Sequence, residues 1–117
     1  MSRERLPDRR PVERHKLVVG GQTLYVDVGR YPDGRLGEVF VTMSRAGTGM
    51  RGMLDAVARL ASVALQHGVP VESVTNAMRG LDFAPQGIVS GHADVTVAVS
   101  VLDALAQLLS APPPPSP

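Results

Sequence analysis

The chain has 117 residues, of which 44% are hydrophobic, 20% are charged and only 3% are aromatic, and its formal net charge is +1. This length can bury one modest core, so we expect a single domain whose core is built from aliphatic side chains. No cysteine is present, which excludes disulfides, thiolate metal sites and thiol chemistry within these residues. No apolar stretch reaches the roughly 20 residues of a membrane span, and the N-terminal segment lacks the apolar core of a signal peptide, so we expect a cytoplasmic protein.

The two ends of the chain differ in composition from its middle. Residues 1–15 are rich in arginine and contain few apolar side chains, which is typical of a segment that orders only on a partner. We therefore predict a basic flexible leader at residues 1–15 and one domain at residues 16–110. The prolines of residues 111–117 predict an extended, disordered tail.

Three strands are predicted in the first half of the domain. Residues 16–19 and 23–29 flank a pair of glycines, which predicts a β-hairpin. A Pro-Asp-Gly turn follows, and residues 37–44 then alternate between apolar and polar side chains as a half-buried strand does. Together these segments predict a three-stranded antiparallel meander.

Helical periodicity begins at Met50 and predicts a helix over residues 50–65 and a second one over residues 71–79. Residues 81–90 read as an irregular loop. Residues 94–109 alternate like a strand at first, but leucines at helical spacing in their second half favour a helix with Asp94 at its start. The predicted fold class is α+β, with the meander followed by about three helices packed on one face.

The glycine loop between the third strand and the first helix is the place where a ligand could bind. Its backbone N–H groups and the positive end of the helix dipole favour an anion, and two arginines lie beside it. The loop therefore predicts a nucleotide or phosphate site, formed by Ser44, Arg45, Gly47, Thr48 and Arg51. The plainer alternative is that Thr48 is an ordinary helix N-cap, and such caps are commoner than phosphate sites.

Two residues outside the loop complete this hypothesis. Arg79 could add a phosphate contact, and Phe83 could stack on a base. Alternatively, Phe83 is a plug on the core. The row formed by Arg51, Asp55 and Arg59 is either a ladder of salt bridges on a solvated helix face or the lining of a site.

Five blocks of sequence carry a resemblance to a known family. They are, in order, LPDRRP, VGRYPDGRLGEVFVTMSRAGTGMRGMLDA, LQHGVPVESV, RGLDFAPQGI and ADVTVAVSVLDALA. This order resembles the TSCPD domain found near the C-terminus of adenosylcobalamin-dependent (class II) ribonucleotide reductases, and the resemblance runs from Leu6 to about Leu109.

Individual motifs match this family closely. Residues 31–40 follow its YPDGRPGEIF block, with Leu36 where proline is usual, and FAPQG matches its FEPAG loop. Ser44 and Gly47 match its SKxGST stretch, in which Arg45 replaces lysine and Gly49 departs from the usual hydroxyl residue.

The resemblance implies a domain attached to deoxynucleotide synthesis, and it does not carry the reaction with it. Ribonucleotide reduction needs a radical cysteine and a redox cysteine pair, and this chain has neither. No catalytic residue is therefore assigned, and cobalamin would belong to a partner reductase chain. The three histidines, His15, His67 and His92, lie too far apart for a short metal-ligand spacing, so we expect no metal site.

Two functions from different classes remain open. The first is an accessory, nucleotide-handling module that docks on a ribonucleotide reductase large chain, with the basic leader as docking arm. The second is a phage-type protein that sequesters a cyclic nucleotide signal and therefore binds a nucleotide-like small molecule. A third hypothesis, an enzyme with Glu38, Asp55 or His67 as general base, lacks a nucleophile, a metal set or a carboxylate pair.

Both leading hypotheses predict self-association, with a homodimer as the simplest form. The meander leaves sheet edges exposed, and the apolar helix at residues 50–65 can bury more than one side. We expect neither membrane contact nor direct nucleic-acid binding.

Overall fold

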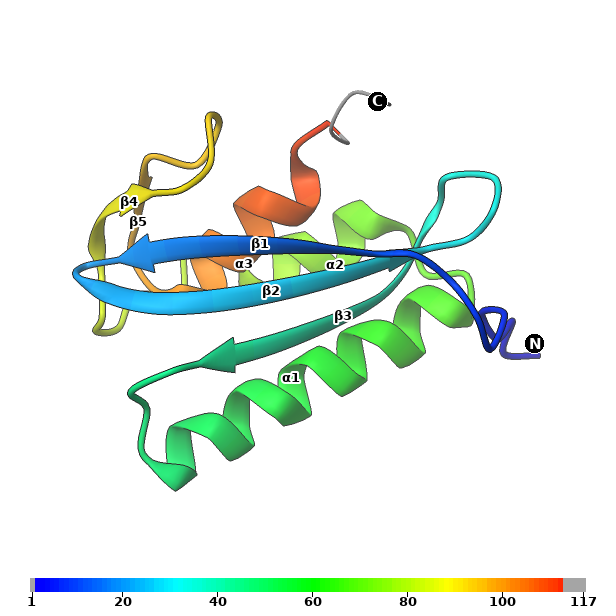
Figure 1. The fold of residues 1–117 in the computed structure, drawn as a ribbon, viewed down its shortest axis with the longest axis horizontal. Coiled ribbons are helices and arrows are strands. Elements are labelled where there is room, and N and C mark those ends of the chain that lie inside the picture. The colour runs from blue at the N-terminus through cyan, green and yellow to red at the C-terminus, as the bar shows by residue number, and fades with distance from the viewer. Residues whose placement is uncertain (1, 113–117) are drawn as a thin grey trace.

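The computed structural model of the protein describes residues 2–112 (Figure 1). Along the chain the elements are β1 (Val12–Val19), β2 (Gln22–Arg30), β3 (Leu36–Met43), α1 (Thr48–Gln66), α2 (Val71–Met78), β4 (Gly87–Ser90), β5 (Val97–Ala98) and α3 (Val101–Ser110). The strands form one antiparallel sheet in the order β3-β2-β1-β4-β5. The predicted α+β class is confirmed.

The meander of β1, β2 and β3 is the longest continuous part of the sheet. β1 and β2 pair along their whole length, from Val12 opposite Gly29 to Val19 opposite Gln22. Gly20 and Gly21 turn the chain between them with φ of 54° and 85°, values that glycine adopts without steric cost. Alternate side chains of each strand enter the core, as period-2 patterning requires, and they include Leu17, Val19, Leu24, Val26, Val28 and Val39.

The helix α1 runs along β3 and covers the hydrogen-bonding edge of that strand. The Ser62 hydroxyl accepts a hydrogen bond from the Val39 N–H at 3.0 Å, and the Gln66 amide donates to the Gly37 carbonyl at 3.0 Å. An uncovered strand edge is a template for pairing with other chains. Side chains of α1 therefore close this edge of the sheet.

The C-terminal part differs from the prediction at two places. The helix predicted over residues 94–109 begins only at Val101, and its N-cap is Ser100, whose hydroxyl accepts from the Asp103 N–H at 3.0 Å. The prediction of Asp94 as the start of this helix is therefore wrong. Before Ser100 only Val97–Ala98 forms a strand, and Val95 is buried whereas Val97 is 58% exposed, so the alternating valines do not share one face.

The second difference is the short ribbon of β4 and β5. Part of the predicted loop 81–90 is β4, which pairs with β1 through Val19 and Val89 and with β5 through Ile88 and Val97. In Figure 1 this ribbon lies at one end of the sheet, and α2 and α3 lie behind the sheet. Strands this short carry too few residues for a clear sequence pattern.

The predicted leader of residues 1–15 overlaps with β1, which begins at Val12. Leu6 is buried, and the Glu4 N–H donates to the Gln66 carbonyl at 2.8 Å. Residues 2–11 thus lie against the domain in this structure, although their composition is that of a solvated segment. Of the predicted tail, residues 113–117 lie outside the described part of the chain.

Candidate functional site

The loop between β3 and α1 is the site that the sequence predicted. Gly47 is the N-cap of α1 with φ −65° and ψ 167°, and no side chain forms a capping hydrogen bond there. Thr48 is the first residue of the helix, so the alternative that it is the N-cap is wrong. The loop residues Ser44, Arg45, Thr48 and Arg51 are all exposed.

The charge around this loop is positive. The first turn of α1 carries no acidic residue, and within residues 2–112 neither Arg45 nor Arg51 forms an ion pair. The N–H groups of the first helical turn have no partner within the helix, and they carry the positive end of its dipole. The loop is therefore chemically suited to attract an anion.

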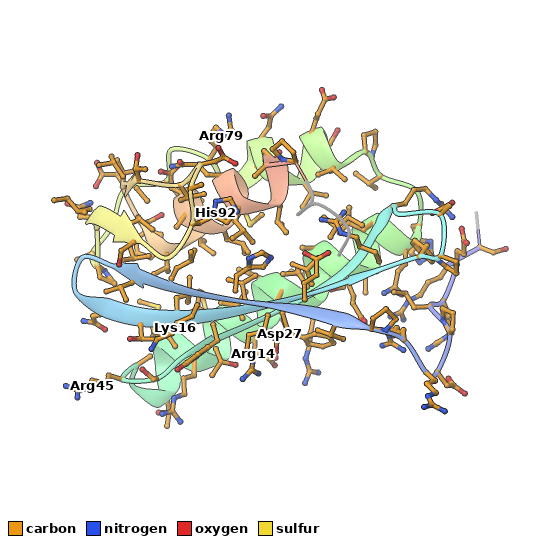
Figure 2. All side chains as sticks on the ribbon, turned by 45° about the horizontal axis from the view of Figure 1, so that its top comes forward. Arg14, Lys16, Asp27, Arg45, Arg79 and His92 are labelled. Carbon is orange, nitrogen blue, oxygen red and sulfur yellow. The ribbon has the colours of Figure 1, made fainter. Side chains whose placement is uncertain are left out.

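The other two predicted residues lie elsewhere. Arg79 is the C-cap residue of α2 and donates from Nη2 to the Ser110 hydroxyl at 2.9 Å. Figure 2 shows Arg45 at the lower left of the molecule and Arg79 at its top. Phe83 is half-buried and packs against the core, and its N–H donates to the Val99 carbonyl at 3.0 Å. The loop thus holds five of the seven residues, Arg79 lies away from it (Figure 2), and Phe83 is engaged with the core.

A buried ion pair lies at the other end of α1, where the sequence favours Glu38 as a salt-bridge former without identifying its partner. The Arg10 guanidinium donates two hydrogen bonds to the Glu38 carboxylate, from Nε at 2.5 Å and from Nη2 at 2.8 Å. The Glu38 side chain is 5% exposed and that of Arg10 is 27% exposed. The space for this carboxylate exists because residue 29 is glycine, since a Cβ there would lie 2.3 Å from Glu38 Oε2.

The Pro-Asp-Gly turn also holds the leader. Arg35 binds Asp33 at 2.7 Å and Glu4 at 3.0 Å, and its guanidinium lies 4.5 Å from the centre of the Tyr31 ring. The Tyr31 hydroxyl donates to the Glu4 carbonyl, and burial raises the pKa of that phenol. The YPDGR block that resembles the family therefore anchors the leader to the domain through Glu4.

The outer face of the meander carries a third paired arrangement. Arg14 binds Asp27 at 2.8 and 2.9 Å and lies 5.3 Å from the centre of the Tyr25 ring, and Figure 2 shows Arg14 and Asp27 side by side. The hydrogen bonds from Arg14 lower the pKa of Asp27, against the opposing effect of burial. The Asp27 carboxylate is therefore held in its ion pair with Arg14 and is a poor general base.

Comparison with known proteins identifies the family of this chain. The profile described as TSCPD domain matches residues 2–111. The chain belongs to the TSCPD domain family. It is 42% identical over 107 residues to a protein of Rhodopirellula baltica named vitamin B12-dependent ribonucleotide reductase, covering 92% of this chain and 10% of that protein. No solved structure matches significantly.

Other relatives carry the same name. The protein of Bradyrhizobium diazoefficiens is 41% identical over 86% of this chain and 8% of its own length, and that of Streptantibioticus cattleyicolor is 41% identical over 86% and 17%. The TSCPD chain thus spans less than a fifth of the length of these relatives. The resemblance stated from the sequence blocks is confirmed at the level of the family.

Two further observations describe what the TSCPD chain contains. Across residues 2–112 no group of three or more His, Asp or Glu side chains is arranged to hold a metal ion. None of the helices in this range is long and apolar enough to span a bilayer.

Proposed function

We propose that this TSCPD chain is a non-catalytic accessory module of ribonucleotide reduction, which docks on a reductase large chain in the cytoplasm and handles nucleotides there. The relationship to the reductases carries this proposal. The identity extends over almost the whole of this chain, and it covers only about a tenth of the reductase from Rhodopirellula baltica. Such a relationship fits a module whose reaction is carried out by another part of the enzyme.

The chemistry of the side chains supports a non-catalytic role. The chain has no cysteine, whereas the reduction requires cysteine redox chemistry. The carboxylates of Glu38 and Asp27 already bind arginines, which leaves neither of them poised as a base. A cobalamin cofactor would accordingly belong to the reductase chain.

The loop between β3 and α1 is our proposed contact for the phosphates of a nucleotide. Arg45 and Arg51 lie beside an open helix N-terminus, and the hydroxyls of Ser44 and Thr48 are exposed there. Guanidinium groups and backbone N–H groups are strong partners of phosphate. Arg79 would act at such a site only if a second chain brought it there (Figure 2), and Phe83 already packs against the core.

The test is native mass spectrometry of the tagged chain, first as isolated from its host and then after addition of ribonucleotides, deoxynucleotides and cyclic nucleotides. Co-purification with a chain identified as a ribonucleotide reductase would support docking. Retention of a nucleotide that the double variant Arg45→Ala/Arg51→Ala fails to bind would support the loop. A bare chain that captures neither a reductase nor any nucleotide would refute the proposal.

A second arm separates the two parts of the proposal. If the double variant still co-purifies with the reductase and has lost the nucleotide, docking and nucleotide binding use different surfaces. A cyclic nucleotide bound tightly in the absence of any reductase would instead favour the sequestering function.

A further inference from the structure

The helix α1 has an apolar face that the described chain leaves largely uncovered, with Val57 and Ala64 half-buried along its edge. We define the outer face of α1 as Met53, Ala56, Val57, Leu60, Val63 and Ala64. Met53 is 68% exposed, Leu60 is 70% exposed and Val63 is 38% exposed. The face that packs on the domain is a different one, and it contains Leu54, Ala58, Ala61 and Leu65.

The spacing of the outer face is that of a helix pair. Met53, Val57, Leu60 and Ala64 follow one another at steps of four, three and four residues. This alternation keeps a seam facing a second helix that crosses at a small angle. No charged side chain interrupts it, since the nearest charges, Asp55 and Arg59, form an ion pair at 3.0 Å along one flank.

A hollow lies on the opposite flank, between α1 and α2. It has a volume of about 310 Å³, and its walls are apolar side chains of both helices, including Val57, Ala64, Val74 and Ala77, with Ser73 the only polar residue among them. A cavity of roughly 150 Å³ is enough to hold a benzene molecule. The hollow can therefore accept a leucine or methionine side chain.

We propose that the outer face of α1 is the interface with a second copy of this chain. The two α1 helices would pack antiparallel about a two-fold axis near Val57, and Met53 of each copy would enter the hollow of the other. A two-fold interface must be self-complementary, and this surface carries both an exposed side chain and a hollow that can receive it.

Charge complementarity selects the antiparallel arrangement. When two identical helices pack antiparallel about a two-fold axis, matching flanks face each other. The flank with Asp55 and Arg59 would then meet its own copy, so that each carboxylate lies toward the guanidinium of the other helix. In a parallel pair, that charged flank would face the apolar hollow instead, which is unfavourable.

The size of the contact sets the expected strength. A helix of 19 residues is about 28 Å long. An interface built on one helix pair lies near or below roughly 1,200 Å², where weak and transient interfaces occur. We therefore expect a dimer that dissociates in the micromolar range.

The first experiment is sedimentation velocity of the purified chain across micromolar concentrations. The variants are Leu60→Glu and Met53→Glu, and the matched control is Ile88→Glu, which alters an equally exposed side chain on β4 at 78% exposure. We expect the two α1 variants to raise the dissociation constant at least about tenfold, because a charge would be buried in an apolar contact. Thermal unfolding checks that each variant is folded.

A wild-type chain that stays monomeric over this range would overturn the proposal. So would dissociation by Ile88→Glu combined with an intact Leu60→Glu dimer. Because the sample contains no other protein, this result does not depend on the proposed reductase partner. If the wild type is monomeric and Leu60→Glu abolishes co-purification with the reductase, the face belongs to that partner instead.

A cross-link tests the orientation of the two helices. The chain lacks cysteine, so a single engineered thiol gives an unambiguous product. Val57→Cys lies near the proposed axis and should form a disulfide-linked dimer on oxidation, whereas Met50→Cys lies at the far end of α1 and should not. Efficient cross-linking of Met50→Cys would contradict the antiparallel arrangement.

Discussion

Arginines lie near both ends of α1, and those at one end are paired whereas those at the other are not. At the end near the leader, Arg10 binds Glu38, and Arg35 binds Glu4 and Asp33. At the other end, Arg45 and Arg51 form no ion pair within residues 2–112. Figure 1 shows the leader and the β3–α1 loop at opposite ends of this helix. The same residue type is therefore structural at one end and available to a ligand at the other.

The largest effect on stability is expected for Glu38→Ala. Glu38 is almost fully buried, and its removal leaves the Arg10 guanidinium without its carboxylate partner. Because Arg10 retains some contact with water, we expect a loss of about 2 kcal/mol in the free energy of unfolding. Urea denaturation measures it, and Glu38→Gln is the control that keeps the shape and removes the charge. If the free energy of unfolding falls no more than it does for substitution of an exposed residue, this ion pair contributes little to stability.

A smaller loss is expected for Ser62→Ala, in the last third of α1 toward the leader. The Ser62 hydroxyl accepts the Val39 N–H, so its removal leaves a buried donor at the sheet edge unpaired. We expect a loss of about 1 kcal/mol in the free energy of unfolding. Ser73→Ala, on the exposed face of α2, is the matched control and should be neutral. Equal losses in the two variants would argue against a special role for this contact.

Low pH should weaken the ion pairs by protonating their carboxylates, whereas the unpaired arginines stay charged. The hydrogen bonds from Arg14 lower the pKa of Asp27 in the folded state, so the unfolded chain takes up that proton first as the pH falls. Stability from this pair is therefore complete above about pH 5 and declines below the ordinary carboxylate range near pH 4. Urea midpoints between pH 3 and pH 7 measure the decline, and Asp27→Asn should flatten it. An unchanged slope in that variant would mean that other carboxylates dominate.

The smallest effect on stability is expected at the loop end. Arg45→Ala and Arg51→Ala should leave the free energy of unfolding unchanged, because both side chains are exposed and unpaired within the described residues. If the loop binds phosphate, the same changes should abolish nucleotide binding in isothermal titration. A clear loss of stability in either variant would break the contrast between the two ends of α1.

The sequence alone determined those parts of the fold that depend on neighbouring residues. The alternation of residues 37–44 and the glycine pair at residues 20–21 placed the meander, and the helical stripe from Met50 placed α1. Ser100 and Asp103 also have the spacing of a helix start, which could have placed α3 correctly. The order of the sequence blocks was enough to indicate the family.

Tertiary structure decided what depends on partners distant in the sequence. Arg10 and Glu38 are separated by 28 positions, and nothing in local spacing shows that they form a pair. In the same way, only the packing shows that Arg79 lies apart from the loop (Figure 2), that Phe83 packs against the core, and that α1 keeps an apolar face outward. Periodicity reports which side chains share a face of an element, because that follows from backbone geometry. What then covers each face follows from the arrangement of the whole chain.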